Sequence, residues 1–213
     1  MADSEVIMDQ DLIFREGEGT KWLKRNEPHL PIKNDLVLDA LGELIGGLNK
    51  TSQVLEIGCS NGWRLEEIKK RYGCKVYGVD PSRTALRLAG QKGVYPILGT
   101  ARDLPMADNS CDMVIYGFCL YLCNREDMFL IAKEGDRVLK DGGLMVIYDF
   151  AAPRPQRVPY KHKNGVWTYK QDYENMFLAS PAYTKLLAKH HVDGQTKAVV
   201  LRKNIEQGWP SCE

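Results

Sequence analysis

The chain has 213 residues, of which 44% are hydrophobic and 27% are charged, and its 29 basic residues nearly balance 28 acidic ones. A chain of this length is expected to form one domain with a sizeable core. The near-neutral charge argues against a surface for nucleic acid or for an anionic membrane. The sequence shows no secretory leader and no apolar run of about 18 residues, the length that a membrane helix needs, so a cytoplasmic location is expected.

The chain contains six cysteines, and no two of them form a C-x-x-C pair. Cys119 and Cys123 lie four positions apart within an apolar stretch. Reduced, buried thiols are the expected state, and no metal site is predicted.

The first 33 residues are polar, and we expect them to be irregular apart from a compact cluster around Trp22 and Arg25. Asp35 then provides an N-cap, and apolar residues follow it at helical spacing. A helix is therefore predicted from residue 36, ending at the glycine pair 46–47 and lying against the sheet.

The middle of the chain alternates strands with helices. The expected strands lie at 53–58, 75–80, 94–98, 112–116 and 144–149, and the expected helices lie at 62–71, 82–91 and 125–139. Pro96 restricts the third of these strands to a sheet edge, because proline lacks the N–H that a central strand uses. This alternation predicts a parallel sheet with helices on both faces.

The pattern changes after residue 150. Residues 151–165 are rich in Pro, Arg and Lys and are expected to run over the surface, and 170–179 is predicted to form one short helix. Two further runs, Tyr183–Val192 and Lys197–Arg202, flank Asp193-Gly194, which is a hairpin turn signal. An α/β sheet that finishes in an antiparallel hairpin is predicted.

The stretch Gln53–Trp63 reads Q-V-L-E-I-G-C-S-N-G-W, an apolar strand followed by a glycine turn and the start of a helix. Small residues let a ligand approach the backbone, and a helix N-terminus offers unpaired N–H groups. The next strand ends in Asp80, whose carboxylate can accept hydrogen bonds from both hydroxyls of a ribose. Ser60 stands where the dinucleotide fingerprint has its second glycine, so the turn suits a ligand without phosphates, such as S-adenosylmethionine.

Four segments in this order resemble the class I S-adenosylmethionine-dependent methyltransferases, specifically their type-11 group. They read V-L-E-I-G-C-S-N-G, V-Y-G-V-D-P-S, G-T-A-R-D-L-P-M-A-D-N-S-C-D-M-V and G-D-R-V-L-K-D-G-G-L-M-V-I. The resemblance implies a Rossmann-like α/β fold, with a mostly parallel seven-stranded sheet, a C-terminal antiparallel hairpin and helices on both faces. The single methyltransferase domain, 1–213, would then comprise an N-terminal cap segment and helix (1–50), a cofactor-binding core (51–150), a substrate-facing insertion (151–182) and a terminal hairpin (183–203).

The resemblance also implies S-adenosyl-L-methionine as the cofactor and assigns residues to it. Those implied to bind it are Glu56, Gly58, Cys59, Gly62, Asp80, Pro81, Ser82, Thr100, Ala101 and Gly117. Thr100 departs from the G-D-A sequence that the family often has here, so a contact with adenine is expected from its hydroxyl or from the backbone N–H of Ala101. Asp103 is either a loop residue or a further cofactor contact.

Substrate contacts are expected from the two ends of the chain, because open α/β sheets keep their variable specificity elements in such segments. The candidates are Trp22, Arg25, Arg154, Lys161, Tyr169 and Lys170. Basic side chains would hold a phosphate or carboxylate, and aromatic ones would stack on a ring. The alternatives are a solvated basic loop after residue 151 and a core or rim position for Trp22.

Methyl transfer depends mainly on alignment, and a general base is needed only where the acceptor must lose a proton early. Candidates for such a base are His162, Tyr116, Tyr121 and Tyr169. No Asn/Asp-Pro-Pro-Tyr motif follows the fourth strand, which argues further against a nucleobase as the substrate.

The predicted function is transfer of a methyl group from S-adenosylmethionine to oxygen or nitrogen of a small polar metabolite, sugar-like or anionic. Two alternatives are a protein that binds S-adenosylmethionine without turnover and an NAD-dependent oxidoreductase. The expected partner is the small-molecule acceptor, with neither nucleic acid nor membrane, and the protein is expected to be a monomer or a homodimer.

Overall fold

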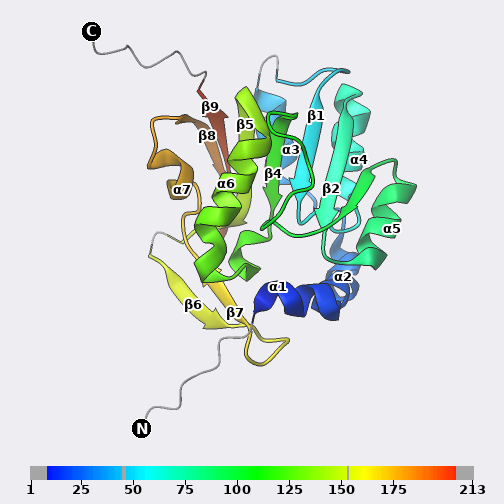
Figure 1. Cartoon of the computed structure of the whole chain (residues 1–213), viewed down its shortest axis with the longest axis vertical. Helices are drawn as coiled ribbons and strands as arrows, with labels where there is room; N and C mark the ends of the chain where they lie inside the picture. The colour runs from blue at the N-terminus through cyan, green and yellow to red at the C-terminus, as the bar shows by residue number, and fades with distance from the viewer. Residues whose placement is uncertain (1–8, 45–46, 153, 205–213) are drawn as a thin grey trace.

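The computed structural model describes residues 9–44, 47–152 and 154–204. Its centre is a seven-stranded sheet in the order β3-β2-β1-β4-β5-β9-β8 (Figure 1). The strands are β1 Gln53–Ile57, β2 Lys75–Asp80, β3 Tyr95–Leu98, β4 Cys111–Gly117, β5 Leu139–Phe150, β8 Tyr183–His190 and β9 Thr196–Lys203. Strands β1 to β5 pair in parallel, whereas β9 runs antiparallel to both β5 and β8. The predicted α/β fold is confirmed, including the edge position of β3.

Alternate residues of each strand face opposite sides of the sheet and build two cores. On one side, Val54 packs with apolar residues of α3 (Leu36–Glu43), α4 (Trp63–Tyr72) and α5 (Arg83–Gln91). On the other side, its neighbour Leu55 packs with residues of α6 (Met128–Val138) and α7 (Asn175–Leu178). Helices therefore cover both faces, as a parallel sheet requires.

Residues 10–29 are helical, so the expectation of an irregular segment was wrong for this part of the chain. The order is α1 (Gln10–Ile13), a π-helical turn (Phe14–Glu18), α2 (Gly19–Asn26) and a 3-10 turn (Glu27–His29). We call residues 10–26 the cover, because α1 and α2 lie across the carboxyl ends of β1 and β2 (Figure 1). The buried positions of the cover include the polar residues Gln10 and Glu18. The spacing of apolar residues that normally predicts a helix is therefore weak in this segment.

The segment after β5 lies on the surface, as expected, but part of it forms strands. Strands β6 (Gln156–Pro159) and β7 (Trp167–Lys170) form a separate two-stranded sheet. Lys170 pairs with Gln156 in it, so the helix predicted at 170–179 is reduced to α7. Helix α3 likewise ends earlier than predicted, at Glu43, and Gly46 of the predicted stop lies outside the described residues.

Strand β5 begins earlier than predicted. Leu139 pairs with Cys111 of β4, and a register shift follows before Leu144 pairs with Met113. The Asp141-Gly142-Gly143 sequence, between the predicted helix 125–139 and the predicted strand 144–149, therefore lies inside β5 at a bulge.

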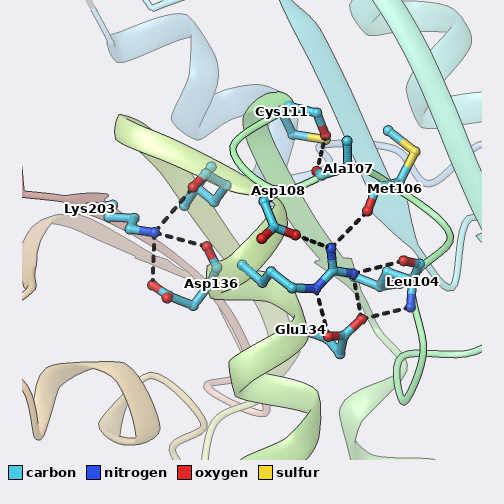
Figure 2. Close-up of polar contacts among 11 residues, drawn as sticks. Leu104, Met106, Ala107, Asp108, Cys111, Glu134, Asp136 and Lys203 are labelled. Atoms are coloured by element: carbon cyan, nitrogen blue, oxygen red, sulfur yellow. Dashed lines mark hydrogen bonds and ion pairs between the residues drawn. The ribbon is translucent and has the colours of Figure 1, made fainter.

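Arg137 of α6 binds the irregular loop that joins β3 to β4. Figure 2 labels its partners Leu104, Met106, Asp108 and Glu134. Its guanidinium donates hydrogen bonds to the carbonyl oxygens of Leu104 (2.9 Å) and Met106 (2.8 Å). It also forms ion pairs with Glu134 and Asp108, each at 2.7 Å. Glu134 in turn accepts a hydrogen bond from the backbone N–H of Leu104 at 2.9 Å. These bonds fix the loop whose beginning lines the cavity described below.

Within the described ranges, no helix combines the length and the apolar composition that crossing a bilayer takes. The same ranges contain no group of three or more His, Cys, Asp or Glu side chains placed to hold a metal ion.

Candidate active site

A cavity of about 770 Å³, part of it open to solvent, lies at the carboxyl ends of the parallel strands. The turns after β1, β2 and β3 contribute Gly58, Ser60, Asp80, Pro81, Thr100 and Ala101 to its lining. The cover contributes Gln10, Asp11, Phe14, Gly19 and Trp22, and the segment after β4 contributes Phe118, Cys119, Leu122, Cys123 and Asn124. Open α/β sheets bind their ligands at this edge, so the position indicates a binding site.

The turn after β1 needs glycine at two positions. Gly58 has a φ of 76°, and a Cβ there would lie 2.7 Å from Cβ of Cys119. Gly62 has a φ of 72°, and its Cβ would lie 2.8 Å from Cβ of Ala89. The left-handed backbone and the close neighbours leave no room for a side chain. Ser60 between them keeps a buried hydroxyl that has no hydrogen-bond partner among the described residues, and a ligand in the cavity could supply one.

Asp80 ends β2 at the edge of the cavity. One carboxylate oxygen accepts a hydrogen bond from the backbone N–H of Ser60 (2.9 Å) and the other from that of Ser82 (2.8 Å). Burial raises the pKa of Asp80 to about 6, although these two bonds lower it. Each carboxylate oxygen has a second lone pair, so Asp80 can still accept hydroxyl donors from a ligand.

Several residues predicted to bind the cofactor lie behind the lining and support it. These are Glu56, Cys59, Gly62, Ser82 and Gly117. The hydroxyl of Ser82 accepts a hydrogen bond from the backbone N–H of Ala85 at 3.2 Å and so caps α5. Gly117 packs directly against the Glu56 carboxylate, and a side chain there would collide with it. The other five, Gly58, Asp80, Pro81, Thr100 and Ala101, are part of the lining.

Glu56 belongs to a buried ion-pair cluster behind the glycine turn. Arg64 of α4 contacts Glu56 and also donates to Asp35 at 2.9 Å. The guanidinium carbon of Arg64 lies 4.9 Å from the ring centre of Trp63 and 5.3 Å from that of Tyr148. The positive charge of Arg64, on α4, therefore links Asp35 at the start of α3 to Glu56 on β1.

Polar side chains hold the cover over the cavity. The amide of Gln10 donates to the carbonyl oxygen of Leu122 at 2.7 Å and accepts from the backbone N–H of Trp167 at 2.6 Å. The hydroxyls of Thr20 and Ser82 lie 2.7 Å apart. The cover therefore contacts the segment after β4, the β6–β7 hairpin and the start of α5.

Arg25 joins the two ends of the chain. It donates to the carboxylate of Glu18 at 2.6 Å and to the hydroxyl oxygen of Tyr160 at 2.7 Å. Tyr160 directly follows β6, and burial raises its pKa to about 12, so it remains a neutral hydroxyl. The cover and the hairpin thus meet at one guanidinium.

Among the residues predicted to contact substrate, Trp22 lines the cavity and Arg25 holds Glu18 instead. The others lie outside the lining, exposed or half-buried in the β6–β7 segment: Arg154, Lys161, Tyr169 and Lys170. Lys170 places its ammonium 3.9 Å from the ring centre of Phe150. The predicted basic platform does not border the cavity in this structure.

Aromatic side chains border the cavity in its place: Phe14 and Trp22 from the cover, and Phe118 after β4. Phe118 has a φ of 59°, which is unusual for a bulky residue, and its backbone N–H donates to the carbonyl oxygen of Tyr148 at 2.8 Å. Its ring centre lies 4.9 Å from that of Tyr121. Backbone strain held by packing of this kind clusters at functional sites.

The four residues predicted as possible bases all lie outside the lining. Tyr116 is fully buried, donates to a backbone carbonyl at 2.7 Å, and has its pKa raised by burial. The hydroxyl of Tyr121 accepts from the indole of Trp22 at 3.3 Å, and burial raises its pKa too. His162 is exposed in the turn between β6 and β7, and Tyr169 is half-buried in β7.

The cavity lining also includes residues that were not predicted to line a site, among them Asp11, Phe14, Cys119 and Cys123. Asp9 caps α1 by accepting a hydrogen bond from the backbone N–H of Asp11 at 3.0 Å, and this N-cap residue was the available signal for α1. Cys119 and Cys123 are half-buried and not fully buried, and burial raises the pKa of both thiols. They therefore face the cavity as neutral groups.

Known methyltransferases resemble this chain in sequence and in fold. The model of a methyltransferase domain matches residues 55–147. A demethylmenaquinone methyltransferase of Staphylococcus aureus (strain JH9) is 32% identical over 151 residues, which cover 67% of this chain and 57% of the relative. The chain thus spans just over half the length of this curated relative.

Solved structures share the fold at low sequence identity. A S-adenosylmethionine-dependent methyltransferase from Mesorhizobium loti superposes with a TM-score of 0.63 at 15% identity, covering 80% of this chain and 99% of that one. The geranyl diphosphate C-methyltransferase of Streptomyces coelicolor A3(2), with Mg²⁺, geranyl diphosphate and S-adenosyl-L-homocysteine, gives 0.63 at 15% identity over 78% and 76% of the two chains.

Proposed function

The chain belongs to the class I S-adenosylmethionine-dependent methyltransferases, and on that premise we propose that its cavity binds S-adenosylmethionine and directs the methyl group to oxygen or nitrogen of a small metabolite. The observation that carries the proposal is Asp80, whose carboxylate is buried at the end of β2 and is held by backbone donors on both oxygens. A fixed carboxylate at this place suits the two hydroxyls of a ribose.

The remainder of the cavity also fits an adenosine with an amino-acid tail. Pro81 and Ala101 offer apolar surface near Asp80, and Thr100 and Ser60 offer hydroxyls. Among the described residues, the lining holds one basic side chain, Arg102, which forms ion pairs with Asp9 and Asp127, both at 3.3 Å. A ligand without phosphates therefore matches the charge of the site better than a dinucleotide does.

S-adenosylmethionine supplies a methyl group on a positively charged sulfur. The acceptor oxygen or nitrogen forms a bond to the methyl carbon as the carbon–sulfur bond breaks, its electrons go to sulfur, and the acceptor proton is lost to solvent. The protein's part is alignment and exclusion of water, which can contribute about 7–11 kcal/mol. The cover and the segment after β4 contribute to both, since they line the cavity on the side away from the sheet.

The acceptor is proposed to lie against Phe14, Trp22 and Phe118. Flat aromatic faces suit a ring, whether a sugar with an apolar face or an aromatic one. The relatives named for demethylmenaquinone and for geranyl diphosphate act on different molecules, so we take the acceptor's class from the aromatic lining and not from those names. The proposed acceptor is a small metabolite with a ring that packs against these three side chains.

Isothermal titration with S-adenosyl-L-homocysteine tests the cofactor half of the proposal. Wild-type protein should bind it at micromolar concentration, and Asp80→Ala should weaken binding at least about tenfold, because two hydrogen bonds to a charged acceptor are lost. Asp39→Ala, on the exposed face of α3, is the matched control. Absence of binding by the wild type at millimolar ligand would refute the proposal, and transfer of labelled methyl into native small-molecule extracts then tests turnover.

A further inference from the structure

The loop after β3 lacks an acid where the sequence resemblance expects one. Thr100 occupies that position, lines the cavity, and accepts a hydrogen bond from Nη2 of Arg15 at 3.0 Å. Asp103, the nearest acid in the loop, is exposed and lies outside the lining. A purine amino group next to Thr100 would therefore find no carboxylate in its own loop.

The cover places a carboxylate at this point. Nε of Arg15 donates to Oδ2 of Asp11 at 2.7 Å, and the same guanidinium reaches Thr100. Asp11 and Thr100 are therefore separated by the width of one guanidinium. The side chain of Asp11 is 12% exposed and belongs to the cavity lining, and among the described contacts its Oδ1 accepts no hydrogen bond.

Asp127, which lines the cavity together with Asp11 and Asp80, has two side-chain partners, whereas the carboxylate of Asp11 has one among the described contacts. Asp127 accepts from the amide of Asn124 at 2.9 Å and pairs with Arg102 at 3.3 Å, both through Oδ2. Asp11 belongs to the cover, and its charge, like that of Asp127, adds to burial in raising the pKa of the Cys123 thiol. The geometric link is to the loop after β3, because Asp11 and Thr100 both line the cavity and bind the same guanidinium.

We propose that Asp11 of the cover accepts the hydrogen bond of the adenine amino group, in place of the acid missing at Thr100. The inference rests on the proposed function, since it assumes that the cavity holds S-adenosylmethionine. The exocyclic amine donates one hydrogen to Oδ1 of Asp11, and the hydrogen bond from Arg15 to Oδ2 orients the carboxylate. Recognition of the base then depends on a residue that reaches the site only when the cover is closed.

S-inosylhomocysteine, in which oxygen replaces the adenine amino group, is the probe that separates this contact from general support of the cover. Wild-type protein should prefer S-adenosylhomocysteine about tenfold or more, because the oxygen cannot donate to a carboxylate. Asp11→Asn keeps the size of the side chain and adds a donor, so the preference should fall to about threefold or less. Both ligands are measured by isothermal titration at the same pH.

Asp9→Asn is the matched control, because Asp9 caps α1 without lining the cavity. It should leave the ratio of the two affinities unchanged even where both affinities fall. An unchanged ratio in Asp11→Asn would overturn the inference and make Asp11 a support of the cover. Failure of the wild type to bind S-adenosylhomocysteine would instead refute the proposed function, so the two failures are distinguishable.

Discussion

The glycine turn after β1 and the cover line the same cavity from opposite sides, yet different forces hold them. The turn sits between strands whose register is fixed by ladder hydrogen bonds, and the buried cluster of Arg64 with Asp35 and Glu56 lies behind it. The cover touches the rest of the molecule through polar side chains such as Gln10 and Arg25 and through the small apolar cluster around Ile13. A structure held in this way should open in parts, with the cover released before the sheet.

This difference suits the proposed methyl transfer, which requires the donor to enter and its product to leave on every cycle. Under that proposal the sheet side keeps Asp80 and the glycine turn in one geometry, and the cover is the part expected to move. Loss of a contact in the core should therefore lower global stability, and loss of a contact in the cover should act locally.

Replacement of Arg64 by Met should have the largest effect. It removes the positive charge between two buried carboxylates and leaves them unpaired, which costs about 3–5 kcal/mol of the free energy of unfolding. Urea denaturation followed by circular dichroism measures it. Arg71→Met is the control on the same helix, since the Arg71–Glu67 pair (2.8 Å) is exposed and should change stability by about 0.5 kcal/mol or less. Equal effects of the two variants would contradict the comparison.

Arg25→Met should act on the cover alone. Glu18, 2% exposed, loses its partner and Tyr160 loses a donor, and a hydrogen bond to a charged group contributes about 1.5–3 kcal/mol. Limited proteolysis should then cut within residues 10–30 faster, while the global urea midpoint changes little. Arg102→Ala, which breaks partly exposed pairs with Asp9 and Asp127, should raise the cutting rate much less. Cutting spread evenly over the chain would show that the cover does not open separately.

Protonation of Asp80 should weaken the cofactor site in a defined pH range. Its pKa lies at about 6 in the folded protein, above the ordinary value of 3.8, because of burial. The folded protein therefore binds the Asp80 proton more tightly than the unfolded chain does. Protonation of Asp80 stabilises the folded state below about pH 4, and this stabilisation is lost as the pH rises through about 6. The affinity for the ligand should change in the opposite direction and rise with pH, because ribose hydroxyls donate to the ionised carboxylate of Asp80.

Affinity for S-adenosylhomocysteine should accordingly fall by up to about tenfold for each pH unit below about 6. Asp80→Asn, which cannot titrate, should bind weakly and show a flat profile over the same range. A wild-type profile as flat as that of the variant would show that Asp80 does not control the pH dependence of binding.

Much of the sheet was predictable, because its residues carry local signals. Buried strands such as Gln53–Ile57 are short apolar runs, and Gly58 and Gly62 mark a turn that only glycine can make. Pro96 correctly placed β3 at the edge. On the cofactor side, Asp80 and Thr100 were found because they follow strand ends in order.

The cover and the hairpin were not predictable, because their structure depends on contacts between distant residues. Gln10 is buried through partners at 122 and 167, and neither pairing leaves a trace in the local sequence. The β6–β7 strands contain Pro159 and several charged residues, which weakens the alternation that reveals a strand. The basic residues of that hairpin predicted a platform at the cavity, but Arg154 and Lys161 are exposed outside it.

The Arg137 network has a consequence for how the sequence can vary in length. One guanidinium binds the carbonyl oxygens of Leu104 and Met106 and the carboxylate of Asp108, so these three groups must keep their spacing. An inserted residue between them would detach at least one of these groups, whereas the exposed turn at Asp193 and Gly194 should accept insertions freely. Grafted peptides or fluorescent labels therefore belong in the terminal hairpin, because a graft in the loop from β3 to β4 would loosen the wall of the cavity.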